Sequence, residues 1–477
     1  MTQIAIVGAG FSGTLLALHL LRRCPRGTEV TLIERSLQFG RGAAYSTGNP
    51  SHLLNVPAGR MSAFHDKPRD FLEWLGQSVE IGIGGLGEHS FVPRRVYGAY
   101  IRHLLNREMK GPGNGVKLNL VRGDAKSIEQ SGDRLAIELS RGRSLAVDLA
   151  VLAVGNFPPE PPPVWDMSFY DTAFYRSDPW APDAFADLEP DDPILLIGTG
   201  LTMVDAMVSL LDQGHRGPVH ALSRRGLLPH RHERAPAPAP RTEAFPTSLV
   251  ELTRFLRGES NRARSEGAGW QVVVDELRPF TLDVWSELSA ADRARFIRHL
   301  RPWWEVHRHR MAAPVADRVE AAIARGQLHV RAGKIQSFCY NSRSVEVTYR
   351  KRATDLIESV HVARVVNCSG PGCDYGRIQH PLVRSLLDAG TVRPDPLKLG
   401  LDVTSGCALK NRKGAISGKL FAVGPVTKGA FWEMTAVPDI RRQCEFLATQ
   451  LSTLMKGAPT AGARSGDLRN EVRALLG

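Results

Sequence analysis

The sequence has no long hydrophobic run. No apolar stretch approaches the roughly 18 residues needed to cross a bilayer, and the first strand-like segment begins at Gln3, which leaves no room for a signal peptide. These two absences argue against a helical membrane protein and against a secreted one. We therefore expect a cytoplasmic protein without a membrane partner.

Cysteine is scarce, and its pattern excludes two common uses. The six cysteines form no C-x-x-C pair and no Cys/His ligand set, so neither structural zinc nor a secreted disulfide framework is expected. We expect no metal site. The cysteines are Cys24, Cys339, Cys368, Cys373, Cys407 and Cys444.

The chain also lacks a basic tail, although its formal net charge is +12. Its 61 basic residues are mostly arginine and are scattered among 49 acidic ones. Nucleic-acid-binding proteins usually gather such residues into a patch or tail, so no nucleic acid partner is expected. Anionic cofactors and an Arg-rich composition account for the charge. The 477 residues and 43% hydrophobic content suit a globular protein of about two to three domains.

What the sequence does contain, at its start, is a dinucleotide-binding turn. The strand-like segment Gln3–Val7 runs into Gly8-Ala9-Gly10-Phe11-Ser12-Gly13, and an apolar helix pattern follows. A G-x-G-x-x-G turn lets backbone N–H groups approach a pyrophosphate at the positive end of a helix. The next strand, Glu29–Ile33, ends at Glu34 and Arg35, and an acid at this distance from the glycines binds a ribose hydroxyl. We interpret the turn as a site for FAD or NAD.

Irregular stretches rich in glycine and asparagine follow, from Gly42 to Met61, and include Tyr45 and Asn55. Such composition favours loops that wrap a ligand, and a surface loop without function is the alternative. Arg94 precedes a helix pattern. It is a candidate for binding phosphate or a substrate carboxylate, or else an ordinary exposed arginine.

Three strand-like segments come next, Val116–Val121, Leu135–Leu139 and Leu145–Val154. The last one stops at Gly155, as expected for a buried parallel strand whose carboxyl end faces the nucleotide. The proline run at 158–163 indicates a crossing between domains.

A second strand, glycine turn and helix appear at Gly198-Thr199-Gly200-Leu201-Thr202-Met203. Met203 stands where a small residue normally permits close packing of helix against strand. The following strand, Val219–Leu222, leads to Arg224 and Arg225, which suit the 2′-phosphate of NADP better than a bare ribose. We interpret this unit as a second nucleotide site, and a degenerate copy retained for structure is the alternative.

From residue 227 to about 325 the pattern becomes helical, for example over Ser289–Leu300, with an Ala-Pro repeat at 235–240. On a further helix two faces would form, with Trp304, His307 and Arg308 on one and Trp303, Val306 and Arg310 on the other. Aromatic surface beside arginine suits an anionic or planar ligand, which makes Arg308 and His309 candidate substrate contacts. Packing tryptophans with solvated arginines are the alternative.

The chain then returns to strands at Gln327–Arg331, Ser344–Tyr349 and Val360–Asn367. Near its end an apolar strand reaches Gly424, and Pro438 suits the first turn of a final helix. The N-terminus of that helix is placed to stabilise negative charge on a reduced flavin.

Together these motifs resemble those of the two-dinucleotide-domain flavoproteins, in particular the FAD/NAD(P)-binding family. The chain is distantly similar to the ornithine and lysine N-hydroxylases, and looks closest to members that oxidise the amine of aspartate to nitrosuccinate. The resemblance covers most of the chain and rests on Gly8-Ala9-Gly10-Phe11-Ser12-Gly13, Gly42-Ala43-Ala44-Tyr45, Leu54-Asn55-Val56-Pro57, Pro93-Arg94 with Tyr97-Gly98, Gly198-Thr199-Gly200-Leu201-Thr202, Arg308-His309-Arg310, and Trp432-Glu433 with Ala436-Val437-Pro438.

The resemblance implies a class B flavin monooxygenase that binds FAD at the first turn and NADPH at the second. It further implies that molecular oxygen is activated as a flavin C4a-hydroperoxide and that a small, anionic, aspartate-like amine is N-hydroxylated. Because a pair of arginines follows only the second turn, the residues also favour FAD at the first. The expected cofactor contacts are Gly8, Gly10, Phe11, Ser12, Gly13, Glu34, Arg35, Gly42, Tyr45, Asn55, Gly155, Gly424 and Pro438 for FAD, and Gly198, Gly200, Thr202, Arg224 and Arg225 for NADPH.

The expected fold class is α/β, with two Rossmann-like dinucleotide-binding domains and a mainly helical insertion. We assign residues 1–190 and 366–477 to a discontinuous FAD domain, 191–226 and 326–365 to the NAD(P) domain, and 227–325 to the insertion.

Two other functions stay open. One is an NAD(P)H-dependent flavin reductase or oxidase acting on a quinone, a disulfide or oxygen, and the other is a non-catalytic flavin-binding redox sensor. Cys368 and Cys373 have the C-x-x-x-x-C spacing of flavin disulfide reductases. They lie in a late turn rather than on a helix after the first glycine motif, which favours coincidence.

Overall fold

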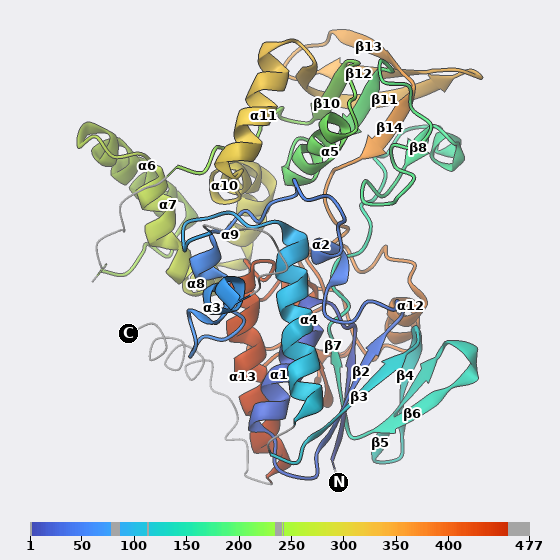
Figure 1. Cartoon of the computed structure of the whole chain (residues 1–477), viewed down its shortest axis with the longest axis vertical. Helices are drawn as coiled ribbons and strands as arrows, with labels where there is room; N and C mark the ends of the chain where they lie inside the picture. Colours follow the sequence, from blue (N-terminus) through green and yellow to red (C-terminus); the bar gives the residue numbers. More distant parts are fainter. Residues whose placement is uncertain (1, 78–85, 112–113, 234–240, 242, 457–477) are drawn as a thin grey trace.

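The computed structural model describes residues 2–77, 86–111, 114–233, 241 and 243–456. Two α/β domains lie one above the other in Figure 1, and a group of helices lies to one side of them. This is the predicted fold class, with two dinucleotide-binding domains and a helical segment.

The sheet of the first domain has the strand order β15-β16-β7-β1-β2-β3, in which every strand but β15 is parallel to its neighbours. At its centre, Ile6 of β1 pairs with Leu32 of β2 and Val151 of β7. The centre is apolar on both faces because both faces of a parallel sheet are covered. The strands are β1 (Gln3–Val7), β2 (Glu29–Glu34), β3 (Lys117–Arg122), β7 (Leu149–Leu152), β15 (Ala408–Lys410) and β16 (Ile416–Ala422).

Three helices of this domain lie side by side in Figure 1, namely α1 (Phe11–Arg23), α4 (Arg94–Lys110) and α13 (Val437–Met455). Arg23 of α1 forms an ion pair with Glu445 of α13. The first helix of the chain is therefore packed against its last described one. Pro438 lies in the first turn of α13, as expected.

A small antiparallel sheet branches from this domain and is formed by β4 (Ala125–Ser131), β5 (Arg134–Leu139) and β6 (Ser144–Val147). Only Asp148 separates β6 from β7, so the single strand expected over Leu145–Val154 is wrong: two strands belong to two sheets. The Asp148 carboxylate accepts a hydrogen bond from the Gln3 backbone N–H at 2.7 Å and so fixes the corner to β1. Strand β4 escaped prediction because its sequence is largely polar.

The second domain has the strand order β13-β12-β11-β10-β9-β14-β8. Its parallel strands are β8 (Tyr175–Arg176), β9 (Ile194–Ile197), β10 (Val219–Ser223), β11 (Leu328–Tyr340) and β14 (Arg364–Asn367), and its antiparallel extension is β12 (Val345–Lys351) with β13 (Ile357–Val362). Here too one residue, Ala363, separates an antiparallel strand from a buried parallel one. The expected strand Val360–Asn367 is therefore also two strands, and the two domains share this corner.

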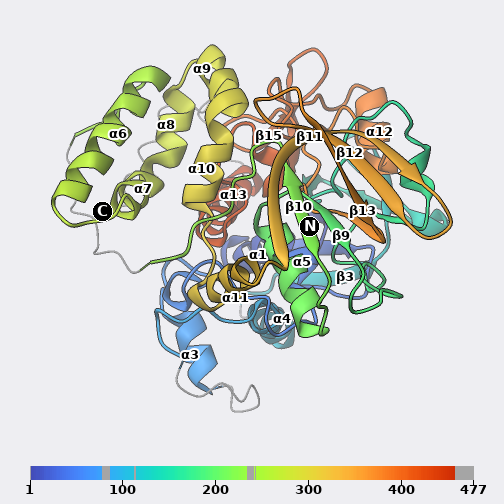
Figure 2. The same ribbon diagram turned by 90° about the horizontal axis from the view of Figure 1, so that it is seen from above.

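The helical segment contains α6 (Leu249–Ser265), α7 (Gln271–Leu277), α8 (Thr281–Glu287), α9 (Ala290–Arg295) and α10 (Arg301–Arg308). Figure 2 shows α6 to α10 beside the sheets. A π-helical turn, Phe296–Leu300, joins α9 to α10 where one helix ending at Leu300 was expected. The next helix, α11 (Ala313–Ala324), packs on α5 (Leu201–Asp212) and β11 of the second domain. Because α11 packs on the second domain, the helices that lie apart from the two domains end near Met311, whereas the helical insertion was expected to extend to residue 325.

The chain crosses between the domains twice, and the two crossings touch. Phe157 and Gly372 form an antiparallel bridge, and the Gly372 N–H donates to the Phe157 carbonyl at 3.1 Å. The Asn367 side chain donates to the carbonyl of Glu160 at 3.0 Å. The proline run at 158–163 is thus anchored at its start to the return crossing.

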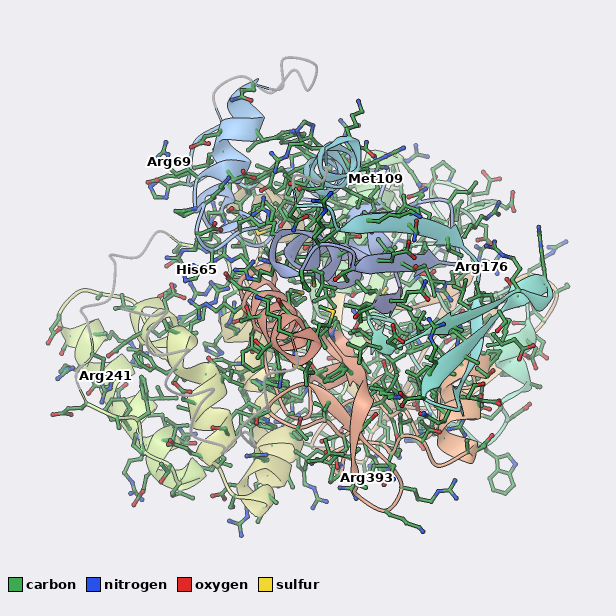
Figure 3. The ribbon with its side chains drawn as sticks, turned by 90° about the horizontal axis from the view of Figure 1, so that it is seen from below. His65, Arg69, Met109, Arg176, Arg241 and Arg393 are labelled. Atoms are coloured by element: carbon green, nitrogen blue, oxygen red, sulfur yellow. The ribbon has the colours of Figure 1, made fainter. Side chains whose placement is uncertain are left out.

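Short helices complete the described fold: α2 (Gly42–Tyr45), α3 (Asp70–Gln77), α12 (Pro381–Asp388) and 3₁₀ turns at Ala58–Arg60, Ser140–Gly142, Ser168–Asp171, Arg278–Phe280 and Pro425–Thr427. Among the described residues, no helix combines the length and the apolar character needed to cross a bilayer. Figure 3 shows Arg69, Arg176, Arg241 and Arg393 on well separated parts of the molecule, in keeping with scattered charge.

Candidate active site

The first glycine turn is packed so tightly that side chains are excluded from two of its positions. Gly8 has φ +107°, and a methyl group there would overlap the Ala153 carbonyl that follows β7. A methyl group on Gly13 would overlap the Gly8 carbonyl. Helix α1 therefore lies directly against the end of β1, which is the close approach that a pyrophosphate site requires.

The N-terminus of α1 is open to an anion. Its N-cap residue is Gly10, which has no side chain to accept from the first N–H groups, those of Phe11, Ser12 and Gly13. Glu34 ends β2 beside this turn, and its carboxylate accepts from the Ala9 N–H at 2.9 Å. The hydrogen bond thus holds the acid beside the turn, while Arg35 is exposed.

The loop from Gly42 reaches the same turn. A methyl group on Gly10 would lie 3.5 Å from the Gly42 Cα, so the two backbones are in contact. The expectation of an irregular chain is wrong at Gly42, which begins the short helix α2. At the end of this helix the Tyr45 ring packs against the Phe11 ring, with 5.8 Å between the ring centroids. Asn55 lies half-buried farther along, in the segment between α2 and the Ala58–Arg60 turn.

Two later segments close over the first turn. Gly155 follows β7 and has open space around it. Gly424 follows β16, and a methyl group on it would lie 2.5 Å from the Ser12 hydroxyl. The Gly424 N–H donates to the Gln443 side chain of α13 at 2.8 Å. The turn, Gly42, Gly155 and Gly424 are thus gathered at the carboxyl edge of one sheet.

The second turn has glycine at the first two positions of the pattern, as the first turn does, but has Met203 at the third. A methyl group on Gly198 would lie 2.5 Å from the Cys368 carbonyl, whereas one on Gly200 would meet no atom within 4 Å. Met203 is fully buried in the core beneath α5, so this helix is not packed as closely on its strand as α1 is. Thr202 lies half-buried in the first turn of α5.

The strand next to this turn ends without an acid. Ser223 stands at the end of β10, as Glu34 does in β2, and its hydroxyl lies 2.9 Å from the Thr199 hydroxyl. Thr199 also donates to the Leu227 carbonyl at 2.6 Å, which fixes the loop that carries Arg224 and Arg225. Arg224 is exposed. The loop therefore offers positive charge where the first domain offers a carboxylate.

Arg94 does not face either turn. Its guanidinium pairs with the buried Asp205 of α5 at 2.7 Å and donates to the Leu53 carbonyl at 3.1 Å. His52 adds a ring nitrogen 2.9 Å from the Ser209 hydroxyl. Arg94 therefore joins the two domains. The signal missed in the sequence is Asp205, a carboxylate on the buried side of the largely apolar helix α5.

The helical segment packs on the C-terminal part of the first domain. Trp285 stacks on Trp432 at 4.9 Å and donates to the Gly429 carbonyl at 2.9 Å. Trp304 donates to the Glu433 carboxylate at 2.8 Å. The tryptophans thus serve packing, and they bring α10 to the chain between Gly424 and Pro438.

Arg308 and His309 lie at this contact. Arg308 is 9% exposed and pairs with Glu433 at 3.2 Å. Burial lowers the pKa of His309 to about 4, although Glu433 opposes the shift, so the ring is neutral near pH 7. The other residues expected beside Arg308 point elsewhere: His307 packs on Trp270, and Arg310 lies beyond the helix end and pairs with Asp275.

Two residues that sequence reasoning missed complete this cluster, Arg278 and Asp439. Burial, followed by the charge of Arg308, lowers the pKa of Arg278 to about 10. Burial raises the pKa of Asp439, against the charges of Arg278 and Arg308. Buried Nη2 of Arg278, Nη2 of Arg308 and Oδ2 of Asp439 have no hydrogen-bond partner among the described residues. Only long-range packing brings them together, so no local motif pointed to them.

Both turns fit the dinucleotides that the sequence predicts. The first has glycines at each close approach, an uncapped helix N-terminus and a positioned acid, which suits FAD. The second has an open glycine and two arginines after a serine, which suits NADPH.

Comparison with known proteins agrees with this geometry. Residues 5–157 match the FAD-NAD(P)-binding family. An L-aspartate N-monooxygenase (nitrosuccinate-forming) of Streptomyces cremeus is 29% identical over 263 residues, which are 46% of this chain and 38% of that protein. A nitrosuccinic acid synthase of Aspergillus oryzae is 27% identical over 266 residues, 49% of this chain and 39% of the relative. The aligned part thus spans about two fifths of these relatives.

A solved ornithine N-hydroxylase of Kutzneria sp. 744, a complex with reduced FAD, NADP+ and L-ornithine, superposes with a TM-score of 0.63 at 14% identity, covering 95% of this chain and 99% of its own. The named relatives are N-hydroxylating flavin monooxygenases. Residues 5–157 are thus similar to the FAD-NAD(P)-binding family, and the chain as a whole has the two-dinucleotide-domain fold of the solved ornithine N-hydroxylase.

Proposed function

We propose that the protein is an NADPH-dependent FAD monooxygenase that N-hydroxylates a small anionic amine of the aspartate class. The observation that carries the substrate class is the pair of buried guanidinium groups, Arg278 and Arg308, each with an Nη2 that lacks a hydrogen-bond partner among the described residues. Buried donors without partners are costly, and a substrate carboxylate would supply the acceptors.

The cofactors divide between the two turns. In this proposal Gly8, Gly10 and Gly13 hold the FAD pyrophosphate and Glu34 its ribose, while Gly198, Gly200 and the arginine loop hold NADPH. When bound, FAD supplies the hydride acceptance and oxygen activation that no side chain provides. The protein then has to position the substrate and keep water from the reacting atoms.

The side chains of the buried cluster have separate tasks in this proposal. Arg308 and Arg278 orient the carboxylates of the substrate. Glu433 keeps Arg308 in place, and its own pKa is lowered chiefly by Arg308 against the opposing effect of burial, so it stays ionised. Asp439, whose pKa is raised by burial, accepts the proton that the substrate ammonium loses before its nitrogen is oxidised. Trp304 donates to the Glu433 carboxylate and so helps to hold it beside Arg308.

The test is oxygen uptake by the FAD-loaded protein with NADPH, with and without L-aspartate. We expect uptake to rise on adding aspartate and an N-oxidised product to form. The Arg308→Gln variant should lose the stimulation while NADPH still reduces its flavin, and Arg298→Gln, an exposed arginine of the same segment, should behave as the wild type.

Three outcomes contradict the proposal in different ways. If NADPH does not reduce the flavin, the protein is no monooxygenase of this class and the redox-sensor alternative gains support. Oxygen uptake without N-oxidised product would indicate an oxidase or reductase. Stimulation by a cationic amine but not by aspartate would refute only the proposal that the substrate is anionic and would leave the monooxygenase activity standing.

A further inference from the structure

A third arginine, Arg352, lies beside the arginine loop and comes from a different part of the chain. It follows β12 directly, in the turn before β13, and its guanidinium Nη1 donates to the Arg224 carbonyl at 3.3 Å. The two residues are 128 positions apart in sequence. Position along the chain therefore gave no reason to group them.

The sheet register places Arg352 at the ribose end of the second nucleotide site. Ser223 of β10 pairs with Ala332 of β11, and the Arg352 N–H donates to the Ala332 carbonyl at 2.9 Å. In a dinucleotide-binding domain the residue at the end of this strand faces the adenine ribose. Arg352 thus lies across β11 from Ser223, level with the carboxyl end of β10.

The charges of this edge are neutralised unevenly. The neighbours of Arg352 have carboxylate partners: Arg350 lies 3.9 Å from Asp355, and Lys351 lies 3.2 Å from Glu358. Across the described ranges, no carboxylate lies within ion-pair distance of Arg224, Arg225 or Arg352. Arg352 and the exposed Arg224 thus lie side by side without acidic partners, and such a pair favours a doubly charged anion, whereas Arg225 donates to the His299 carbonyl at 3.4 Å.

We propose that Arg352 binds the 2′-phosphate of NADPH together with Arg224 and so determines the preference for NADPH over NADH. This inference rests on the proposed function for the identity of the nucleotide. One nitrogen of Arg352 is engaged by the Arg224 carbonyl, which fixes the guanidinium and leaves its other donors for phosphate oxygens. The antiparallel extension β12–β13 is then part of the cofactor site.

The experiment measures binding rather than turnover. NADP+ and NAD+ are titrated separately into the FAD-loaded full chain by calorimetry, without substrate, for the wild type, Arg352→Ala, Arg352→Lys and the control Arg350→Ala. We expect Arg352→Ala to raise the Kd for NADP+ about tenfold and to leave the Kd for NAD+ within about twofold. Arg352→Lys should recover part of the loss, and Arg350→Ala should change neither constant.

The salt dependence distinguishes direct contact from positioning. If Arg352 contacts the phosphate, the steepness with which the NADP+ Kd rises with salt falls in Arg352→Ala, because one ionic contact is lost. Equal loss of both nucleotides would overturn the inference, as would an unchanged NADP+ Kd or a wild type that does not prefer NADP+. A protein that prefers NADP+ through Arg352 but oxidises no amine would refute only the proposed function.

Discussion

The two glycine turns of this chain have the same first two glycines and differ at the third position, which is Gly13 in the first turn and Met203 in the second. Gly8 and Gly198 each approach the carbonyl of a residue that follows the neighbouring strand, and a glycine is the N-cap residue of both helices. On the side that faces the core, Gly13 touches the Gly8 carbonyl, whereas Met203 fills the corresponding place with a buried side chain. The third glycine of the first turn thus permits close helix packing, which the second turn lacks.

The substitution expected to have the largest effect is Gly13→Ala, in the first turn. Because the new methyl group would overlap backbone rather than a movable side chain, we expect the free energy of unfolding to fall by about 3 kcal/mol or more and FAD to be lost. FAD content and urea unfolding measure this. Gly200→Ala is the control, since nothing lies within 4 Å of its methyl group, and it should keep FAD and lose less than about 1 kcal/mol. Normal FAD content in Gly13→Ala would show that the helix can move away.

The opposite change is made in the second domain by Met203→Ala. Removing this fully buried side chain leaves a cavity beneath α5 and should lower the free energy of unfolding by about 2 to 5 kcal/mol, with FAD retained. Urea unfolding followed by flavin and tryptophan fluorescence separates the domains. Met109→Ala, which is 43% exposed in the first domain, should change stability by about 0.5 kcal/mol or less. A neutral Met203→Ala would mean that α5 settles closer to its strand.

Acid should weaken both domains through buried histidines, and the first domain more. Burial lowers the pKa of His19 in α1 to about 3 and that of His220 in β10 to about 4. A histidine with a lowered folded pKa binds its proton more readily when unfolded, so its stabilising contribution is complete above about pH 6.5 and declines as the pH falls below it. We expect the free energy of unfolding to decrease by a few kcal/mol between pH 7 and 4.

Replacing the histidine tests that assignment. His19→Leu should flatten the pH dependence of urea unfolding more than His220→Leu does, and the exposed His361→Leu should leave it unchanged. An identical pH profile in the wild type and His19→Leu would assign the acid sensitivity to other groups.

The smallest effect is expected at the cysteines near the second turn. The Cys368 carbonyl lies against Gly198 as the Ala153 carbonyl lies against Gly8. Cys368→Ala therefore places in the second domain the residue that the first domain has at the equivalent position. Burial raises the pKa of the Cys368 thiol, which keeps it protonated and unsuited to dithiol chemistry. Cys368→Ala and Cys373→Ala should each leave NADPH-dependent oxygen uptake within about twofold. Loss of uptake in either variant would instead support a disulfide reductase.

The sequence predicted what local pattern determines. Glycine spacing, apolar strands and helix-terminal prolines gave the fold class and both turns, because each is encoded within about 30 residues. The corners at Asp148 and Ala363 were missed, since an apolar run carries no sign of a change of sheet. Arg94 and Asp205, or Arg308 and Glu433, meet only through tertiary packing, so no single segment of sequence predicted those pairs.

The bridge between Phe157 and Gly372 brings together the two points at which the chain leaves and re-enters the first domain. The chain leaves the first domain and re-enters it through adjacent backbone, and side-chain contacts such as Arg94 with Asp205 and Trp304 with Glu433 hold the intervening part against the first domain. Such an arrangement lets a whole domain be inserted into an existing one without disturbing the host sheet, because β7 and β16 still pair directly with each other.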